Sequence, residues 1–465
     1  MKKVKTMLLS LALCLCLGLG LAGCGGTGGP NTSYDPDLDV DPDITATLNI
    51  AILNTNEERN IMQELTTGFK TMYPNVSFTF TQLTTYETGI IQAIQEGLML
   101  DVLWVPDAYV TSMADSNLLL DLTEYIEAEA ASSASDKFDV NDYYPSMIKL
   151  GQYKHGTDPE NQDQYFLPRD YSKIVTYVNT ALLGQYAPEF DFDYYRENMG
   201  EWTWDVFVDL CKTLKAGMDA VSDNRICIES DWSWLIQFYG MMLSYGGTYL
   251  NENGEVVMDE GFQETLRSVK TLIDAGYTDY TGAGSLTQYF HGGNAVMCFQ
   301  PRPYLATASV LRDDLDVLPF PAITENEAGE ELTPYVGTGT TGYGICSYSE
   351  NPNLAWQFLK YMMSADGQTV LSNTGSVVPA MISLREGTDG VEPGWRLFRQ
   401  EYNYNHDAFV FGEERDVVQS YYDMLTSSEA ERHNNALLNL FNHYYPLNSN
   451  RTLEDVIAEY KESVR

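Results

Sequence analysis

Basic residues are scarce in this chain. Its 465 residues include 27 Lys and Arg against 66 Asp and Glu, which gives a formal net charge of -39 at pH 7. Such an imbalance disfavours binding to nucleic acid and adhesion to anionic lipids or cell-wall polymers, because these surfaces are themselves negative. We therefore expect no nucleic-acid partner.

Signatures of enzymes and metal sites are also missing. The five histidines do not form HExxH, no GxSxG motif occurs, and no cysteine pair has CxxC spacing. The sequence therefore offers no metal site, no cofactor and no catalytic residue. The competing class is a surface-anchored glycoside hydrolase, which needs only two carboxylates at a suitable separation, and 66 acidic residues provide such pairs by chance.

Long apolar runs are confined to the N-terminus. Lys2, Lys3 and Lys5 precede an apolar stretch from Met7 to Leu21, which is too short to span a bilayer as a mature helix and is typical of an export signal. No later run approaches the ~18 residues of a membrane span, so contact with the membrane should come through an anchor only.

The export signal ends in Leu21-Ala22-Gly23-Cys24, which resembles a bacterial lipobox. The resemblance implies a signal peptide at 1–23 and a diacylglycerol thioether on Cys24; the alternative is an ordinary secretory signal followed by a chance cysteine. Two or more acyl chains, at ~0.8 kcal/mol per buried methylene, hold a protein stably on a bilayer. We expect an extracytoplasmic protein, lipid-anchored to the outer face of the cytoplasmic membrane.

Residues 24–43 are rich in Gly, Pro and Asp, so we expect a flexible acidic tether there. The alternating Asp residues suggest a calcium loop, but the turn glycine and closing Glu of an EF-hand are absent. Beyond the tether, Cys211, Cys227, Cys298 and Cys346 remain. They allow three disulfide pairings, and buried free thiols are an equal alternative.

The first part of the mature chain alternates strand and helix patterns. Strand patterns at 48–52, 76–80 and 102–105 alternate with helix patterns at 61–72 and 90–94. Thr55 and Glu58 fit a capping box at the first helix. This βαβαβ order predicts a mostly parallel sheet, in which ligands bind beyond the carboxyl ends of the strands.

Several blocks of the chain resemble family 1 extracellular solute-binding proteins, the maltodextrin and oligosaccharide receptors of ABC importers. Tyr165–Tyr171 followed by Thr176–Asn179 is similar to the family's crossover, and Trp202–Asp205 is similar to one of its helix starts. The other matching blocks are Asp101–Trp104, Leu118–Leu122, Ser244–Gly247, Phe290–Met297 and Ala355–Leu359. Each block is short, but together they follow the family's order along nearly the whole mature chain.

The resemblance implies an α/β, two-lobed, periplasmic-binding-protein-like fold. Each lobe would be a mostly parallel sheet flanked by helices, with hinge crossovers between the lobes. Lobe 1 would comprise 44–168 plus 336–384, and lobe 2 would comprise 169–335 plus 385–465. It also implies a monomer that captures a solute, closes by a hinge motion and docks on ABC permease subunits. A ligand-sensing subunit for a membrane receptor would share this site and differ in its partner.

Gly337–Gly342 matches the GxGxxG pattern of dinucleotide-binding proteins. The context rejects that function, because no amphipathic helix opens there and Tyr343–Ser347 continues as a strand. The family interpretation is a glycine-rich strand near the hinge, where small residues let the ligand or the opposite lobe approach closely.

A sugar presents apolar C–H faces and hydroxyl groups, so its receptor combines aromatic rings with amide, carboxylate and guanidinium groups. The resemblance places such groups on the strand-end loops, the first crossover and the second lobe. The substrate-binding candidates are Asn54, Asn56, Glu57, Trp104, Asp107, Asp170, Tyr171, Trp232, Trp234, Gln300, Arg302 and Tyr343.

Some candidates have structural alternatives. Trp104 could belong to the core, Glu57 could only stabilise a helix N-terminus, and Arg302 could pair with a neighbouring carboxylate. Trp232 and Trp234 would point to opposite faces of an extended segment, so only one of them should reach the site. A contact from Arg302 would allow an acidic sugar despite the net charge, because charges beyond ~8 Å are screened.

Residues 385–446 depart most from the family pattern, and Phe409 or Phe411 could add an aromatic contact. Micromolar binding needs only about 8 kcal/mol, which a few hydrogen bonds and stacked rings supply. The sequence therefore predicts a lipid-anchored substrate-binding component of an ABC importer that binds a carbohydrate or similar polar solute.

Overall fold

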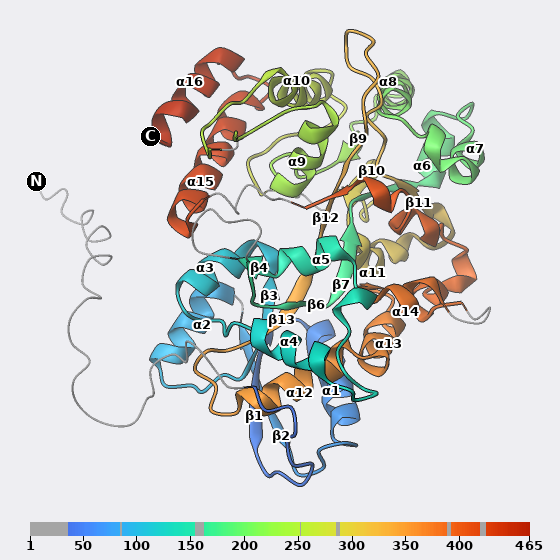
Figure 1. Cartoon of the computed structure of the whole chain (residues 1–465). Helices are drawn as coiled ribbons and strands as arrows, with labels where there is room; N and C mark the ends of the chain where they lie inside the picture. The colour runs from blue at the N-terminus through green and yellow to red at the C-terminus, as the bar shows by residue number, and fades with distance from the viewer. Residues whose placement is uncertain are drawn as a thin grey trace, which may run out of the picture.

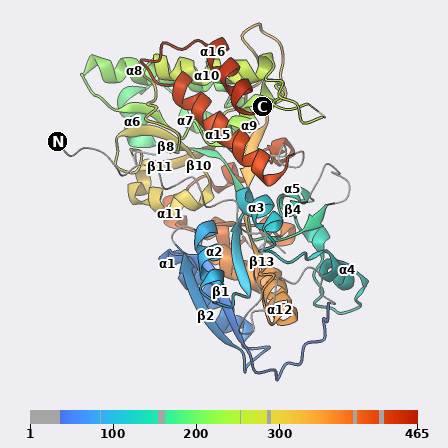
Figure 2. The same ribbon diagram turned by 90° about the vertical axis from the view of Figure 1, so that its left-hand side faces the viewer.

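The computed structural model describes residues 36–83, 86–153, 162–251, 253–284, 289–387, 392–418 and 425–465. They form two α/β lobes, which lie one above the other in Figures 1 and 2. Each lobe has its own sheet and its own buried apolar core. The two-lobed α/β fold expected from the sequence is confirmed. The predicted export signal and Cys24 lie outside the described residues.

The sheet of the first lobe has the strand order β2-β1-β3-β13-β6. Its strands are β1 (Thr47–Leu53), β2 (Ser77–Leu83), β3 (Val102–Pro106), β6 (Leu167–Pro168) and β13 (Thr341–Ile345). β1, β2 and β3 are parallel, as the βαβαβ pattern predicts, whereas β13 runs antiparallel to both of its neighbours.

The sheet of the second lobe has the order β11-β8-β10-β9. Its strands are β8 (Val175–Asn179), β9 (Ile226–Glu229), β10 (Ala295–Gln300) and β11 (Leu315–Pro319). β9 and β10 are parallel, and β8 runs antiparallel to β10 and β11. The expectation of a mostly parallel sheet is therefore wrong for this lobe, because β8 enters it from the hinge in the opposite direction. The reversed strand of each sheet, β13 or β8, directly follows a crossover, because the chain enters each lobe there from the hinge.

A third sheet joins the lobes, with the order β14-β7-β12-β15. Its strands are β7 (Asp170–Lys173), β12 (Val336–Gly339), β14 (Val378–Pro379) and β15 (Asp416–Val417). β7 leads into β8, β12 leads into β13, and β15 precedes the last two helices. We call this the hinge sheet, because three of its strands, β7, β12 and β15, carry the chain between the lobes. A separate two-stranded pairing joins β4 (Gln152–Tyr153) to β5 (Asp163–Gln164).

Helices cover both main sheets (Figure 1). Those around the first sheet are α1 (Asn56–Phe69), α2 (Tyr86–Gln95), α3 (Val110–Asp115), α4 (Thr123–Ala131), α5 (Pro145–Leu150), α12 (Pro352–Met363), α13 (Ala365–Asn373) and α14 (Ile382–Glu386). Those around the second are α6 (Thr180–Tyr186), α7 (Phe192–Glu197), α8 (Trp204–Ala220), α9 (Leu235–Ser244), α10 (Glu260–Asp274), α11 (Leu305–Ala308), α15 (Ser427–Tyr444) and α16 (Leu453–Ser463). No helix in the described part of the chain is both long and apolar enough to cross a bilayer.

Side-chain caps explain where several helices begin. Thr203 caps α8, and Thr452 with Asp455 forms a complete capping box at α16. At α1 only half of the predicted box forms. Thr55 accepts from the amide of Glu58 at 3.1 Å, but the Glu58 carboxylate turns to an ion pair with Arg169. A buried guanidinium therefore outcompetes the reciprocal cap.

The segment expected as a tether is partly packed. Leu38 and Val40 lie against the first core, and Gln357 Nε2 donates to the Leu38 carbonyl at 3.0 Å. The apolar residues between the aspartates find a surface of the first lobe, so this end of the segment is not free. Within the 24–43 segment, residues 36–43 are described and residues 24–35 lie outside the described structure.

The four remaining cysteines are buried free thiols. Cys227 Sγ donates to the backbone oxygen of Cys211 at 3.2 Å, while Cys298 and Cys346 lie in separate cores. Of the two interpretations that the sequence left open, the structure therefore has the free thiols.

Candidate functional site

The loops of both lobes converge on one face of β12. A Cβ added to Gly337 would collide with the carbonyl oxygen of Ile236, at the start of α9 in the second lobe. A Cβ added to Gly339 would lie 3.0 Å from Oδ2 of Asp107, which follows β3 in the first lobe. Alternate residues of a strand face the same side. The glycine-rich segment therefore brings the two lobes together, as expected for a hinge strand.

Asp107 is half-buried at this junction. Its Oδ1 accepts from the amide of Ala108 at 2.7 Å, and its Oδ2 accepts from the amide of Thr340 at 3.3 Å. Burial raises the pKa of Asp107 to about 6, although these two amides oppose the shift. Its carboxylate is thus ionised at neutral pH and can accept hydrogen bonds from hydroxyl groups.

Asp170 lies next to this site but is enclosed. Its Oδ1 accepts from the Thr340 hydroxyl at 3.0 Å and from the Thr341 amide at 3.1 Å, and the residue is 4% exposed. Burial raises its pKa, and the neighbouring Arg169 opposes that rise. The side chain therefore ties the first crossover to the second, and its carboxylate is turned to protein donors.

Tyr171 is also buried, on the hinge sheet. Its hydroxyl donates to Oδ2 of Asp416 in β15, and its ring centroid lies 5.1 Å from that of Tyr144. The structure therefore places Tyr171 between two crossovers, away from solvent.

The first loop of the first lobe presents polar side chains to solvent. Asn54 follows β1 and Asn56 begins α1, and both are exposed. The side chain of Glu57 lies outside the described part of the chain. The loop stands at the carboxyl end of β1, the edge that also carries Asp107.

Trp104 and Tyr343 are neighbours in the sheet of the first lobe. They are directly paired in the antiparallel register of β3 and β13, so both side chains lie on the same face. Trp104 is 8% exposed and Tyr343 is fully buried. Both belong to the first core, which is the structural alternative that the sequence left open for Trp104.

An ion pair absent from the sequence predictions lies close to Tyr343. Glu58 at the start of α1 pairs with Arg169, and both side chains are nearly buried. Burial alone would lower the pKa of Arg169, but Glu58, Tyr343 and Asp170 together raise it above its ordinary value. The sequence did contain a signal for this ion pair. Arg169 directly follows the apolar Leu167-Pro168 segment, and a charge next to a buried strand requires a partner of opposite sign.

The two tryptophans of the second lobe separate as expected. Trp232 is buried, and its Nε1 donates to the Thr278 hydroxyl at 3.0 Å. Trp234 is half-buried at the N-cap position of α9, immediately before the segment that contacts β12. Of the pair, Trp234 is the ring that the structure leaves accessible beside the hinge.

Gln300 and Arg302 end β10 in different environments. Gln300 is half-buried at the strand end, whereas Arg302 is 0% exposed. Arg302 donates to the carbonyls of Gly375 at 2.9 Å and Trp395 at 2.5 Å, and to His406 Nδ1 at 2.7 Å. Its guanidinium carbon also lies 4.5 Å from the centroid of the Phe409 ring.

The candidates thus fall into two sets. Those with accessible side chains near the strand ends are Asn54, Asn56, Asp107, Trp234 and Gln300. Those enclosed by protein are Trp104, Asp170, Tyr171, Trp232, Arg302 and Tyr343. Thr340 was not predicted, yet it contacts both Asp107 and Asp170. Its position between two glycines of the hinge segment was the signal in the sequence.

The lobes also meet away from the hinge. Helix α15 of the second lobe packs against α3, which follows Asp107 in the first. The hinge sheet and this helix contact together connect the two lobes. This arrangement defines a two-lobed protein whose halves are joined by a hinge.

The chain belongs to the bacterial extracellular solute-binding protein family, whose model matches residues 54–369. A search of curated proteins finds no match. Among solved structures, the chain is similar to the GacH receptor of Streptomyces glaucescens, solved unliganded and with acarbose. The identity is 16%, the match covers 91% of this chain and 98% of that one, and the TM-score is 0.68.

Two further structures share the fold. An ABC substrate-binding protein from Listeria monocytogenes in complex with cycloalternan is 16% identical, with 90% and 98% of the two chains covered and a TM-score of 0.69. The maltose-maltodextrin binding protein of Alicyclobacillus acidocaldarius is 15% identical, with 90% and 99% covered and a TM-score of 0.64. The near-complete coverage of each chain shows that the whole two-lobed architecture is shared.

Proposed function

We propose that this protein is the lipid-anchored substrate-binding component of an ABC importer and that it binds a neutral carbohydrate between its lobes. The proposal is carried by one observation: Asp107 of the first lobe and the start of α9, directly after Trp234 in the second lobe, both contact β12. A carboxylate that accepts from hydroxyl groups and a ring that stacks on C–H faces are the two elements that a sugar requires. The division of the chain at 168/169 and 335/336 is part of the same proposal. The third division, expected at 384/385, would cut α14 (Ile382–Glu386), whose Ser383 binds Asp142 of the first lobe, so we place it after this helix.

The electrostatics of the site support a neutral solute over an anionic one. Arg169 is paired with Glu58, and Arg302 is buried with its donors engaged by protein acceptors. Asp107 meanwhile adds a carboxylate at the accessible surface. An anionic sugar would face this negative charge with neither of these guanidiniums to neutralise it.

The structural neighbours support a sugar as the solute. The Streptomyces receptor was solved with acarbose, and the Listeria protein was solved with cycloalternan. At 16% identity these neighbours share the fold, so the solute of this chain has to be established by binding.

A thermal-shift panel tests the proposal. Mono-, di- and oligosaccharides, polyols and phosphorylated sugars would be added to the mature protein. A solute at ~100 times its Kd adds ~2.7 kcal/mol of stability, which raises the melting temperature measurably. We expect a neutral saccharide to give the largest shift. A shift from phosphorylated sugars alone would contradict the assignment of a neutral solute.

The anchor and partner are proposed from the lipobox and from the family. Labelling with a fatty-acid analogue should tag the wild-type chain and not a Cys24→Ala variant. Co-purification from membranes should recover ABC permease subunits. Recovery of a sensor kinase alone would instead favour the ligand-sensing alternative.

The hydrolase alternative can be tested directly. A glycosidase needs two carboxylates that flank a sugar, yet of the neighbouring pair Asp107 and Asp170 the latter is held by Thr340 and Thr341. We therefore expect purified protein to leave oligosaccharides intact during prolonged incubation. Cleavage products that vanish in an Asp107→Asn variant would overturn this part of the proposal.

A further inference from the structure

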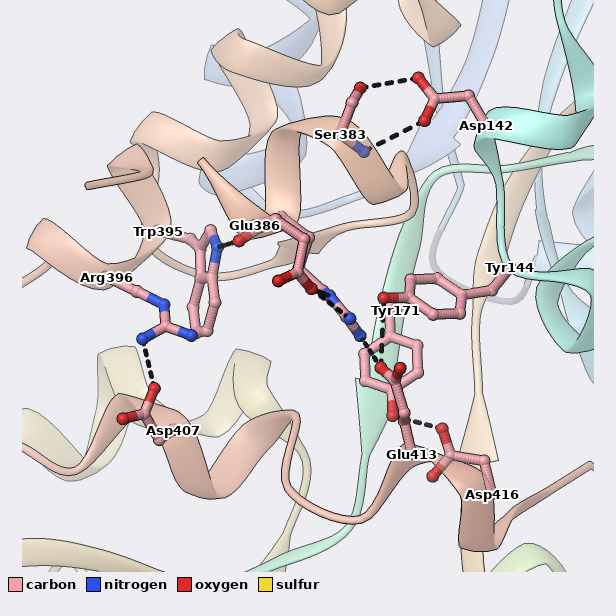
Figure 3. Close-up of polar contacts among 11 residues, drawn as sticks. Asp142, Tyr144, Tyr171, Ser383, Glu386, Trp395, Arg396, Asp407, Glu413 and Asp416 are labelled. Carbon is pink, nitrogen blue, oxygen red and sulfur yellow. Dashed lines mark hydrogen bonds and ion pairs between the residues drawn. The ribbon is translucent and has the colours of Figure 1, made fainter. Parts of the chain in front are cut away.

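A polar cluster lies beside the hinge sheet. Figure 3 shows Tyr144, Tyr171, Glu413 and Asp416 gathered in one place, with Trp395, Arg396 and Asp407 apart from them. None of the clustered residues is among the accessible strand-end group. The cluster nevertheless connects elements of the first lobe to the last crossover.

On the first-lobe side, the central residue is Arg385 in α14. Its guanidinium carbon lies 4.3 Å from the centroid of the Tyr144 ring, and the residue is 5% exposed. The helix is fastened to the first lobe by Ser383, whose amide and hydroxyl donate to the Asp142 carboxylate at 3.1 and 2.7 Å. Arg385 is therefore positioned by the Tyr144 ring and by the attachment of its helix to Asp142.

On the crossover side, the partner is Glu413. Its Oε2 forms an ion pair with Arg385 Nη1 at 2.5 Å and accepts from the Tyr144 hydroxyl at 3.3 Å. Glu413 stands three residues before Asp416, the first residue of β15. Any movement of the first lobe relative to this crossover changes the geometry of the pair.

The crossover itself is firmly placed. Asp416 forms an ion pair with Lys173 Nζ at 2.6 Å and accepts from the Tyr171 hydroxyl. Lys173 also donates to the backbone oxygen of Phe411 at 2.8 Å. Burial lowers the pKa of Lys173, and the Asp416 carboxylate opposes that shift. These bonds fix the first and third crossovers to one another.

We propose that Arg385 and Glu413 form a latch that sets the angle between the lobes and thereby the affinity for the solute, without touching the solute. The pair is made in the conformation in which α15 of the second lobe packs against α3 of the first, so breaking it removes an interaction that belongs to this arrangement of the lobes. Apparent affinity scales with the fraction of molecules in the binding-competent conformation. This inference rests on the proposed binding function only for its effect on affinity.

The test uses Glu413→Gln in the mature protein. Glu413 is 45% exposed, so the substitution leaves no buried site empty. The matched control is Asp274→Asn, which breaks the ion pair of Asp274, 51% exposed, with Lys270. Both residues lie in α10 of the second lobe, so that pair spans no hinge. Two measurements follow for each variant.

The first measurement needs no solute. Spin labels on cysteines introduced at Met72 in the first lobe and Val221 in the second, both exposed, report the distance between lobes. We expect Glu413→Gln to lengthen or broaden the distance distribution and Asp274→Asn to leave it unchanged. Identical distributions for wild type and both variants would overturn the latch.

The second measurement is the affinity for maltotriose by calorimetry. We expect Glu413→Gln to weaken it by about threefold to tenfold, Asp274→Asn to leave it unchanged, and an Arg385→Glu, Glu413→Arg double variant to recover part of the loss. Equal loss in the control would refute the latch. Absence of binding by the wild type to every saccharide would count against the proposed function, while the distance measurement would still decide the latch.

Discussion

Replacing Arg302 by Met separates a structural role from a ligand contact. The sequence placed this residue among the candidates for binding, whereas the structure buries it completely. The guanidinium donates to Gly375, Trp395 and His406. His406 must accept through Nδ1, because its Nε2 lies 3.0 Å from the Phe398 carbonyl and has to donate there. Burial and the nearby Arg302 charge lower the pKa of His406 to about 3, which keeps the ring neutral.

The size of the effect follows from these partners. Methionine fills much of the same space beside Trp395 and Phe409 but donates nothing, so three buried acceptors lose their donor. Each unsatisfied buried acceptor costs about 1–3 kcal/mol. Removal of the cation offsets part of this loss of stability, because a buried charge is unfavourable. The same burial lowers the pKa of Arg302 to about 9. We expect a net loss of about 3 kcal/mol.

Urea titration followed by tryptophan fluorescence measures that loss. Binding of the solute identified in the thermal-shift panel should change by less than about threefold at a temperature where the variant remains folded, because 3 kcal/mol is only part of a typical folding free energy. A variant of wild-type stability that binds a hundredfold more weakly would refute the structural assignment and restore Arg302 to the binding site.

Three further predictions concern the hinge and the strand ends. Gly240→Ala should lower the free energy of unfolding by about 1–3 kcal/mol in urea titration, because its methyl would lie 2.6 Å from the amide of Gly337. Trp234→Ala should abolish the thermal shift given by the solute with little loss of stability, whereas Trp232→Ala should cost about 3–5 kcal/mol as a buried aromatic residue. Asp107→Asn should weaken solute binding, and it should remove a component of the pH dependence of stability. Since burial raises the pKa of Asp107 to about 6, the folded state holds this proton more tightly than the unfolded state, and wild-type stability falls as pH rises from about 4 to about 6.

Each of these predictions has a clear contrary outcome. An undiminished thermal shift in Trp234→Ala would remove that ring from the site. Full stability of Gly240→Ala would show that α9 can withdraw from β12 without cost. A pH profile of stability that Asp107→Asn leaves unchanged between pH 4 and 6 would mean that another group carries that dependence.

Local pattern accounts for much of the fold. The alternation of apolar residues in β1 and the continuous run in β3 predicted parallel strands, and Thr203 and Thr452 marked true helix starts. These features depend on neighbours within a few residues, so they are readable without tertiary context. The capping box at α1 shows the limit of such reading, because Glu58 found a distant guanidinium that is stronger than its local partner.

The candidate site was predicted less completely. The sequence pointed to the strand-end loops, because their polar residues directly follow buried strands. It also predicted that only one of Trp232 and Trp234 reaches the site, and Trp234 is the less buried of the two. It did not distinguish Asp107 from Asp170. Both are aspartates at the end of an apolar segment, and only the packing of Thr340 and Thr341 shows that one is enclosed.

The sequence by itself determined the class of fold and the glycines that let the two lobes meet, because periodicity and residue size act locally. The tertiary structure alone decided which charged groups face solvent. Arg302, Arg385 and Glu58 each found partners far away in the chain, and only folding sets those distances. Burial then decides whether a charge binds a solute or holds the protein together, because a charge taken out of water must be satisfied where it lies.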